Sequence, residues 1–342
     1  MTQTADHPRT QLQPGAPAAR AWAGSIQQLS IIGLTVVLWA ISIAKSSNVP
    51  LWAGNLLTDA AGIGIIACGM TFVMIAGGFD LSVGSTAAVC GVVAVLAMQE
   101  LAPAGPGVAI PLAIIITLAA GAVLGALNGA LIAYVGVNPF VVTLSSMFVF
   151  RGIGLVLTHG GQSQVVPLAL SETFRLVYWG GFRVLGLKIS VPVLTFIGVF
   201  LVCLYLLRLT RFGHYVYAVG GNQRAAWLAG INTRLITAFT YVLSGLVCAA
   251  AAVLWTGLST TAQASDYMGR EMLVIAAVIV GGTPLAGGRG GLFSTLSGLL
   301  LLCTIDQLLT QFGVDPQYRQ IVTGLIIVTV VAVDSYFKRR RN

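Results

Sequence analysis

Residues 109–134 read AIPLAIIITLAAGAVLGALNGALIAY and contain no charged side chain. A helix needs about 20 apolar residues to cross the roughly 30 Å hydrocarbon core of a bilayer, and this run is long enough. The whole chain agrees, because 57% of its 342 residues are hydrophobic and only 8% are charged. Soluble domains carry about 25% charged residues. The sequence therefore predicts an all-α integral membrane protein.

Further apolar runs predict about ten transmembrane helices in one domain over residues 29–337. The expected spans are 29–45, 56–76, 81–98, 109–134, 140–158, 191–208, 236–256, 265–283, 291–310 and 319–337. Residues 1–28 are rich in Pro, Gly, Ala and Gln and predict a disordered cytoplasmic tail. Residues 338–342 form a short basic tail. The eighth span is the weakest, because its first turns hold three charged residues: Asp266, Arg270 and Glu271.

The basic residues indicate the orientation, because Lys and Arg collect in cytoplasmic loops. The loop 209–235 carries three arginines and no acid, so we expect it in the cytoplasm together with both termini. This rule also explains the net charge of +8 without a nucleic-acid partner. The loop 159–190 then lies outside, and its aromatic residues are expected to meet an external protein: Phe174, Tyr178 and Trp179.

Two turns of similar sequence suggest an internal repeat. Residues 136–139 read Gly-Val-Asn-Pro, and residues 313–316 read Gly-Val-Asp-Pro. Proline interrupts a helix, while Asn or Asp caps the next one. In the predicted topology the two turns lie on opposite sides of the membrane, so spans 2–5 and 7–10 would form an inverted repeat.

Residues 75–85, IAGGFDLSVGS, interrupt two apolar runs with three glycines and several polar groups. One interpretation is a turn at the membrane edge, in which Asp80 and Ser82 cap the third span. The alternative is a discontinuous helix that lines a transport pathway. The residue types favour the cap, with a structural and gating role at the cytoplasmic end of the pathway.

Ionisable groups inside membrane spans are costly and usually face a partner or a cavity. Arg151 and Asp306 lie at similar depth when counted from the cytoplasmic face, at 1.5 Å per residue. We therefore hypothesise that they form an ion pair. The alternative is that Arg151 extends to the outer interface and Asp306 faces water. Further candidates for pathway or gating roles are Asn128, Asn138 and Glu271.

A short helix is predicted within the basic loop. Asn222 is a suitable N-cap, residues 223–229 can form about two helical turns, and Gly230 can end them. The apolar residues of this helix need a cover, which either the membrane helices or a soluble partner could supply.

Enzymatic and nucleotide-binding functions are poorly supported. The three histidines are scattered, and no pair of acids has the spacing of an acid–base site. The glycine-rich residues 281–291 lack the Gly-Lys-Ser/Thr ending of a phosphate-binding loop. The five cysteines lie within apolar runs without metal-ligand spacing, so they are expected to be packing residues.

Four stretches resemble the permease subunits of bacterial ATP-binding-cassette importers for monosaccharides, the ribose, xylose, arabinose and galactose group. They are GGFDLSVGS (77–85), GALNGALIAYVGVNPFVVTLSSMFVFRGI (125–153), AVGGNQRAAWLAGI (218–231) and AAVIVGGTPLAGGRGG (276–291). The resemblance implies a fold similar to the cobalamin-type importer permeases and a location in the bacterial inner membrane. It implies a transport subunit rather than an enzyme.

The resemblance also implies partners. These are a second permease chain, a cytoplasmic ATPase subunit that binds ATP and Mg in place of this chain, and a periplasmic protein that delivers the sugar. The residues expected to couple to the ATPase are Gly220, Gly221, Asn222, Arg224, Ala225, Ala226, Gly230 and Ile231. Two alternatives remain at this point. One is an ATP-binding-cassette permease for branched-chain amino acids, and the other is an ion-coupled transporter that uses Asp80, Glu271 and Asp306.

Overall fold

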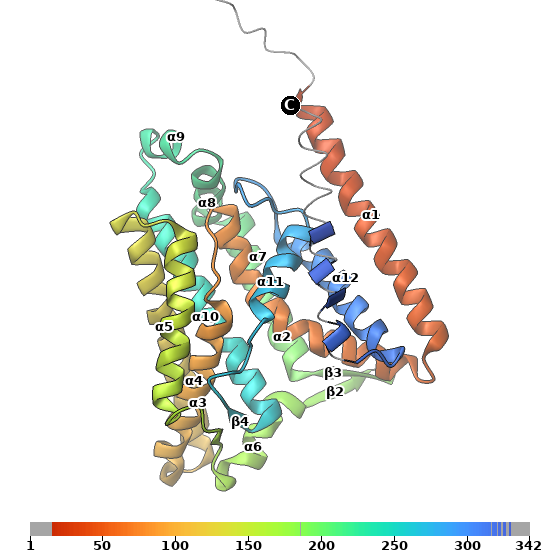
Figure 1. The fold of residues 1–342 in the computed structure, drawn as a ribbon, viewed down its shortest axis with the longest axis vertical. Helices are drawn as coiled ribbons and strands as arrows, with labels where there is room; N and C mark the ends of the chain where they lie inside the picture. Colours follow the sequence, from red (N-terminus) through yellow and green to blue (C-terminus); the bar gives the residue numbers. More distant parts are fainter. Residues whose placement is uncertain are drawn as a thin grey trace, which may run out of the picture.

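The structure, a computed structural model, describes residues 16–184 and 186–315, and beyond them 317–319, 321–322, 324–325 and 328–329, with side chains from residue 28. The predicted tail 338–342 and most of the tenth predicted span lie outside these residues. Within the described part, helices dominate and two small sheets join loops (Figure 1). The helices are α1 (Ala16–Lys45), α2 (Val49–Ile75), α3 (Val83–Leu101), η1 (Ala102–Ala104), α4 (Pro106–Ala130), η2 (Leu131–Val135), α5 (Pro139–Leu157), α6 (Leu168–Trp179), α7 (Val191–Leu209), α8 (Arg211–Gly221), α9 (Gln223–Leu228), α10 (Thr233–Ser259), α11 (Arg270–Val280) and α12 (Leu292–Gln311).

Eight described helical segments are long and apolar enough to cross a membrane. They confirm the predicted all-α membrane fold. They are Gln28–Lys45, Val49–Ile75, Val83–Ala104, Pro106–Val135, Pro139–Leu157, Val191–Leu209, Thr233–Ser259 and Leu292–Gln311. The count of ten spans stays a prediction, because the last predicted span falls mostly on residues that are not described and the eighth is not among the eight segments.

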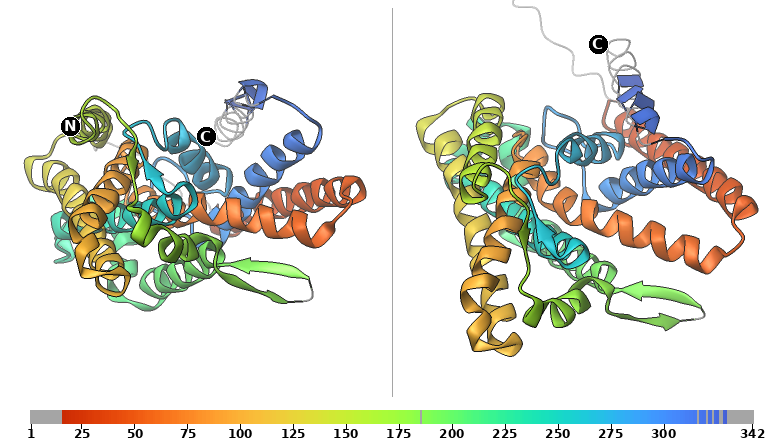
Figure 2. Two further views of the ribbon diagram at one scale, coloured as in Figure 1. Left: turned by 90° about the horizontal axis from the view of Figure 1, so that it is seen from below. Right: turned by 60° about the horizontal axis from the view of Figure 1, so that its bottom comes forward.

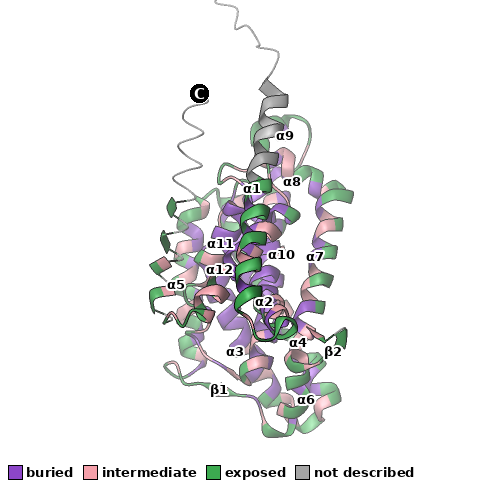
Figure 3. Ribbon diagram, turned by 90° about the vertical axis from the view of Figure 1, so that its right-hand side faces the viewer, coloured by how far each residue is buried: buried purple, intermediate pink, exposed green. Residues whose placement is uncertain are grey.

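The helix α10 occupies the centre and packs against α2, α3 and α4. Small residues allow the closest of these contacts. A Cβ atom on Gly121 of α4 would lie 2.7 Å from the Cβ of Ala249 on α10, so only glycine lets the two backbones approach this far. Figure 3 shows the buried residues concentrated on the central helices. The outer helices expose large apolar side chains, such as Ile115, Phe148 and Leu201, as lipid contact requires.

The eighth predicted span differs from a complete transmembrane helix. Residues 265–269 form turns, and α11 begins only at Arg270 and ends at Val280. Its 11 residues extend about 16 Å, which is too short to cross a bilayer. The three charged residues explain why this span is not a continuous helix. Asp266 lies in the irregular turns, and Arg270 and Glu271 lie in the first turn of α11.

The first helix is longer than the sequence predicted. The helix α1 begins at Ala16, inside the segment 1–28 that was expected to be a disordered tail, while residues 1–15 lie outside the described part. Residues 16–28 contain alanine, arginine and glutamine and only one proline, which favours helix. Figure 2 shows α1 and α2 diverging from a short connection, with α12 beside α1.

The predicted outer loop 159–190 is mostly ordered. It contains the helix α6 and a hairpin of β2 (Gly181–Val184) and β3 (Leu187–Ser190), which pair antiparallel. The strands β1 (Gln164–Val165) and β4 (Thr261–Ala262) also pair. Phe174 is fully buried, so the expectation that it meets an external protein is wrong. Trp179 is 47% exposed, because α6 packs one face on α10 and turns Trp179 away from it.

The two turns of the proposed repeat share one backbone feature. Gly136 and Gly313 both adopt a left-handed conformation, with φ of 82° and 72°. The Asn138 side chain accepts a hydrogen bond from the Phe140 backbone N–H at 2.9 Å and caps α5. The inverted repeat itself remains a prediction, because its last helix falls mostly outside the described residues.

Candidate functional site

The short helix α9 lies at one end of the molecule, at the top of Figure 1. The Asn222 side chain accepts a hydrogen bond from the Ala225 backbone N–H at 2.9 Å, which confirms the predicted N-cap. Gly230 is left-handed with φ of 82°, and the Ile231 backbone N–H donates to the carbonyl of Ala226 at 3.1 Å. These contacts close the helix as predicted.

The α9 helix is only partly covered by its own chain. Ala226 is buried among residues of α2, α7, α8 and α10. Trp227 and Leu228 are 65% and 72% exposed. The predicted need for a cover is therefore met only in part. The protein's other helices cover Ala226, while the side chains of Trp227 and Leu228 remain accessible to a partner.

Three glycine-rich stretches meet behind α9. A Cβ atom on Gly220 would overlap the carbonyl oxygen of Ile75 at the end of α2. The Gly288 backbone N–H donates to that same carbonyl at 2.8 Å. A Cβ atom on Gly287 would lie 2.7 Å from the Cα of Gly77. Glycine is thus required for close backbone approach, and the junction connects the end of α8, directly before α9, to α2 and to residues 281–291.

A tyrosine adds a side-chain contact to this junction. The Tyr217 hydroxyl of α8 donates to the carbonyl of Gly290 at 2.8 Å. Burial raises the pKa of Tyr217, and the nearby charge of Arg208 lowers it in part. The hydroxyl therefore stays protonated around neutral pH and keeps donating this hydrogen bond.

A cleft of about 1300 Å³ opens beside α9. Two arginines, Arg224 and Arg234, belong to its lining, and none of the described residues around it is acidic. Three asparagines that cap helices also line it: Asn138, Asn222 and Asn232. Helix N-termini carry partial positive charge, so the cleft suits acidic groups of a partner.

The stretch 77–85 is not a cap at the membrane edge, contrary to the favoured prediction. Asp80 is only 4% exposed, and Ser82 is fully buried. Asp80 Oδ1 accepts hydrogen bonds from the Ser82 backbone N–H at 2.9 Å and the Ser82 hydroxyl at 2.6 Å. The helix α3 begins at Val83 without a side-chain cap, because the Ser82 backbone is helical rather than extended (φ −84°, ψ −4°) and its hydroxyl oxygen accepts from Asn128.

Asp80 belongs to a buried polar network that links four helices. The Ser244 hydroxyl of α10 donates to Asp80 Oδ2 at 3.1 Å. Asn128 of α4 donates to the Ser82 hydroxyl oxygen at 2.8 Å, and the Ser146 hydroxyl of α5 donates to Asn128 Oδ1 at 2.5 Å. Each carboxylate oxygen of Asp80 therefore accepts at least one hydrogen bond from within the protein, so the network is a structural connection.

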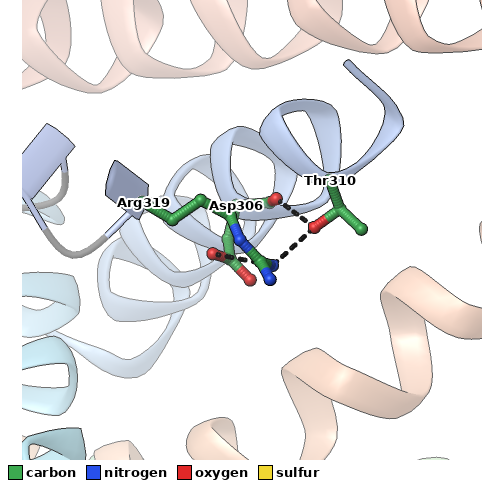
Figure 4. Close-up of polar contacts among 3 residues, drawn as sticks. All are labelled: Asp306, Thr310 and Arg319. Carbon is green, nitrogen blue, oxygen red and sulfur yellow. Dashed lines mark hydrogen bonds and ion pairs between the residues drawn. The ribbon is translucent and has the colours of Figure 1, made fainter. Parts of the chain in front are cut away.

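The hypothesised ion pair between Arg151 and Asp306 is wrong. Asp306 of α12 lies 3.7 Å from an Arg319 guanidinium nitrogen, and Arg319 also donates to the Thr310 hydroxyl (Figure 4). Arg151 instead donates to the backbone carbonyls of Ala264 and Asp266. Equal depth did not imply contact, because α5 packs on α3 and α4 whereas α12 packs on α1, α2, α7 and α11.

The Arg151 contacts define a segment that the sequence did not reveal. After α10 the chain runs along α3, from Gly91 towards Gly84, without forming helix. We name these residues, 261–269, the re-entrant segment. Ala262 lies against Gly91, and the Tyr267 carbonyl lies against Gly84. These glycines are about 10 Å apart along α3. Glu271 follows this segment; it is 8% exposed, and its Oε1 accepts from the Gly269 backbone N–H at 3.2 Å.

Sequence reasoning missed Asp59 on α2 as a site residue. Asp59 is exposed, and its carboxylate interacts electrostatically with Arg270 and Asp306. The sequence did contain one indication of this residue, because Asp59 is the single acid in the predicted apolar span 56–76.

The chain is similar to sugar import permeases. Residues 52–331 match the family described as branched-chain amino acid transport system / permease component. The ribose import permease protein RbsC of Bacillus subtilis is 39% identical over 316 residues, which cover 91% of this chain and 94% of that protein. The RbsC of Escherichia coli K12 is 36% identical over 318 residues, covering 92% and 95%.

A further relative has a different sugar in its name. The galactose/methyl galactoside import permease protein MglC of Haemophilus influenzae is 33% identical over 298 residues, covering 84% of this chain and 87% of that protein. No solved structure matches the chain with significance.

Proposed function

We propose that this chain, which belongs to the permease family of the branched-chain amino acid transport systems, carries a monosaccharide of the ribose–galactose group. It is the membrane subunit of a sugar importer of the ATP-binding-cassette class. It is a transport subunit and not itself an enzyme. The curated relatives quoted above support a sugar over a branched-chain amino acid, although the family carries the amino acid name. They also disfavour an ion-coupled transporter.

Membership of this family implies an ATPase and a periplasmic sugar-binding protein as partners. We propose that two copies of this chain form the pathway and that ATP and Mg bind to the ATPase subunits. Both termini and α9 would face the cytoplasm, as the arginines of the loop 209–235 favour. The exposed Trp179 and the β2–β3 hairpin would then face the binding protein.

One observation carries the coupling proposal: α9 exposes Trp227 and Leu228, while Gly220 at the end of the preceding helix α8 packs backbone-to-backbone on Ile75 of α2. Exposed apolar side chains favour a docking partner. The adjacent cleft, with Arg224 and Arg234, favours acidic groups on that partner. A movement of the ATPase would therefore move α9, and through Gly220, Ile75 and Gly288 it would move α2 and residues 281–291.

Alternating access follows from this connection. The binding protein delivers the sugar at the outer end, and closure of the ATPase subunits shifts α9 and rocks the membrane helices between outward and inward openings. The permease needs only weak sugar contacts, because tight binding would slow release into the cytoplasm.

The coupling proposal is tested with Ala225→Glu, which places a charge on the exposed face of α9. In vesicles containing the ATPase and the loaded binding protein, we expect stimulated ATP hydrolysis to fall at least tenfold while membrane insertion persists. The matched control is Ala104→Glu on η1 at the opposite end, where the same change at an exposed alanine should leave stimulation unchanged. Unchanged stimulation in Ala225→Glu would remove α9 from the coupling route.

The cargo is tested separately by a binding screen of ribose, xylose, arabinose and galactose on the partner binding protein. Uptake of the bound sugar should be lost in cells that lack this permease. Uptake of none of the four sugars, combined with uptake of a branched-chain amino acid, would overturn the assignment.

A further inference from the structure

The re-entrant segment places irregular backbone within the membrane-spanning body. Arg151 lies about 18 Å along α5 from Pro139, and it donates to the carbonyls of Ala264 and Asp266. Ala264 also packs against Gly154 of α5, where an added Cβ would lie 3.2 Å from the Ala264 Cβ. The inner side of the segment is therefore held by α3 and α5.

The other side of the segment is open. Met268 is 68% exposed, and Gly269 beside it is also exposed. Met272, in the first turn of α11, is 48% exposed. Irregular backbone at membrane depth is tolerated only where it is buried in protein or lines a water-filled cavity, because lipid cannot satisfy its polar groups. Lipid therefore cannot cover the exposed side, which leaves a second protein chain or the aqueous pathway between two chains to face it.

Charged and aromatic side chains gather at this opening. The Arg270 guanidinium lies 5.1 Å from the centre of the Trp255 ring. The Trp255 and Tyr267 rings are 5.5 Å apart. Arg270 and Asp59 interact electrostatically with each other and with Tyr178 of α6. Side chains from four helices thus gather at this opening: α2, α6, α10 and α11.

The groups at this place are available to a ligand. Among the described residues, the Asp59 carboxylate accepts no hydrogen bond and forms no ion pair within 4 Å, and Arg270 donates none from its side chain. Asp80 is the opposite case, with three hydrogen bonds to its carboxylate. The carboxylate of Asp59 is exposed, and the guanidinium of Arg270 is half-buried beside the Trp255 ring. Ionisable groups inside a membrane protein that lack hydrogen-bond partners indicate a functional site.

We propose that Asp59 and Arg270, beside the ring of Trp255, form the sugar-contacting site of the translocation pathway at the edge of the re-entrant segment. The proposal rests on the assignment of the chain as a sugar permease. The carboxylate can accept hydrogen bonds from two sugar hydroxyl groups, while the guanidinium donates several in a fixed geometry. The indole ring offers an apolar face to the C–H groups of a sugar.

So few contacts with the sugar suit a site through which it passes rather than a site that retains it. One carboxylate, one guanidinium and one aromatic ring would hold a monosaccharide weakly. Asp306 adds a second negative charge near Asp59, but it lies within ion-pair distance of Arg319. We therefore place Asp306 beside the site and not among its contact residues.

The test uses the complete transporter, reconstituted with its ATPase and its binding protein. We expect Asp59→Asn and Arg270→Gln each to lower sugar uptake at least tenfold, while stimulation of ATP hydrolysis by the loaded binding protein stays within twofold. The matched control is Glu100→Gln, which removes an exposed carboxylate at the end of α3 and should change neither rate. Normal uptake in both site variants would overturn the proposal.

Equal loss of uptake and of ATPase stimulation would also overturn it, because the residues would then serve docking of the binding protein. A second measurement does not depend on transport. The native cysteines are all buried, so Asp59→Cys introduces one exposed thiol. A membrane-impermeant thiol reagent should modify it, and millimolar ribose should slow the modification severalfold. A thiol that does not react, or reacts equally fast with the transported sugar present, contradicts the site.

The two proposals fail in different ways. Absence of uptake of any monosaccharide by the wild-type transporter would refute the assigned cargo. Normal uptake by the wild type, together with normal uptake by Asp59→Asn, would refute only the site.

Discussion

Asp80 and Asp59 are two carboxylates in the same membrane-spanning body, and their surroundings are opposite. Asp80 is 4% exposed and accepts three hydrogen bonds from Ser82 and Ser244. Asp59 is exposed and interacts with Arg270 only at longer range. A polar residue in an apolar run therefore has no single role. A carboxylate that accepts several hydrogen bonds stabilises the packing of helices, whereas a carboxylate that accepts none is free to contact cargo.

Replacing Asp80 should have the largest effect on stability. Asp80→Ala leaves the donors of Ser82 and Ser244 without their acceptor, and we expect a loss of about 3–5 kcal/mol. The melting temperature of the purified protein in detergent measures this loss. The matched control is Asp59→Ala, which should melt close to the wild type. Equal losses in the two variants would remove the distinction between the carboxylates.

Arg151 tests whether the re-entrant segment depends on its side-chain anchor. Arg151→Met removes the donor to the carbonyls of Ala264 and Asp266, and we expect a cost of about 2–4 kcal/mol. Amide hydrogen exchange should accelerate in residues 261–269. The exposed Arg175 of α6 supplies the control, since Arg175→Met removes no such contact. Exchange as slow as in the wild type would show that α3 alone holds the segment.

Ser146 tests how far the Asp80 network extends. Ser146→Ala removes one hydrogen bond to Asn128, and we expect a loss of about 1 kcal/mol. If the network acts as a unit, the same change should cost less when Asp80→Ala is already present. Fully additive changes in melting temperature would mean that Ser146 and Asp80 act independently.

Asp306 should show the smallest effect. Its side chain is 55% exposed and its pair with Arg319 has a separation of 3.7 Å, and exposed pairs contribute about 0–1 kcal/mol. Asp306→Asn should therefore melt within a degree or two of the wild type at physiological salt, about the shift that such a small free energy produces. A loss comparable to that of Asp80→Ala would require a buried partner for Asp306.

Several features could be predicted from neighbouring residues alone. The apolar runs predicted the membrane helices, and the sequence around Asn222 predicted both ends of α9. The charged residues 266, 270 and 271 marked the eighth span as irregular. Each of these features depends on local periodicity, capping or charge within a few residues of the chain, which the sequence displays directly.

Other features needed the tertiary structure. Asp80 meets Ser244 from a helix 164 residues away, and Arg151 meets Ala264 rather than Asp306. The glycine-rich stretches 75–85, 218–231 and 281–291 lie far apart in the sequence, yet they pack against one another beside α9. Local residues account for where most helices form and where they break. Which face of each helix is buried could not be predicted in this way, because helix rotation and neighbours depend on packing between distant segments.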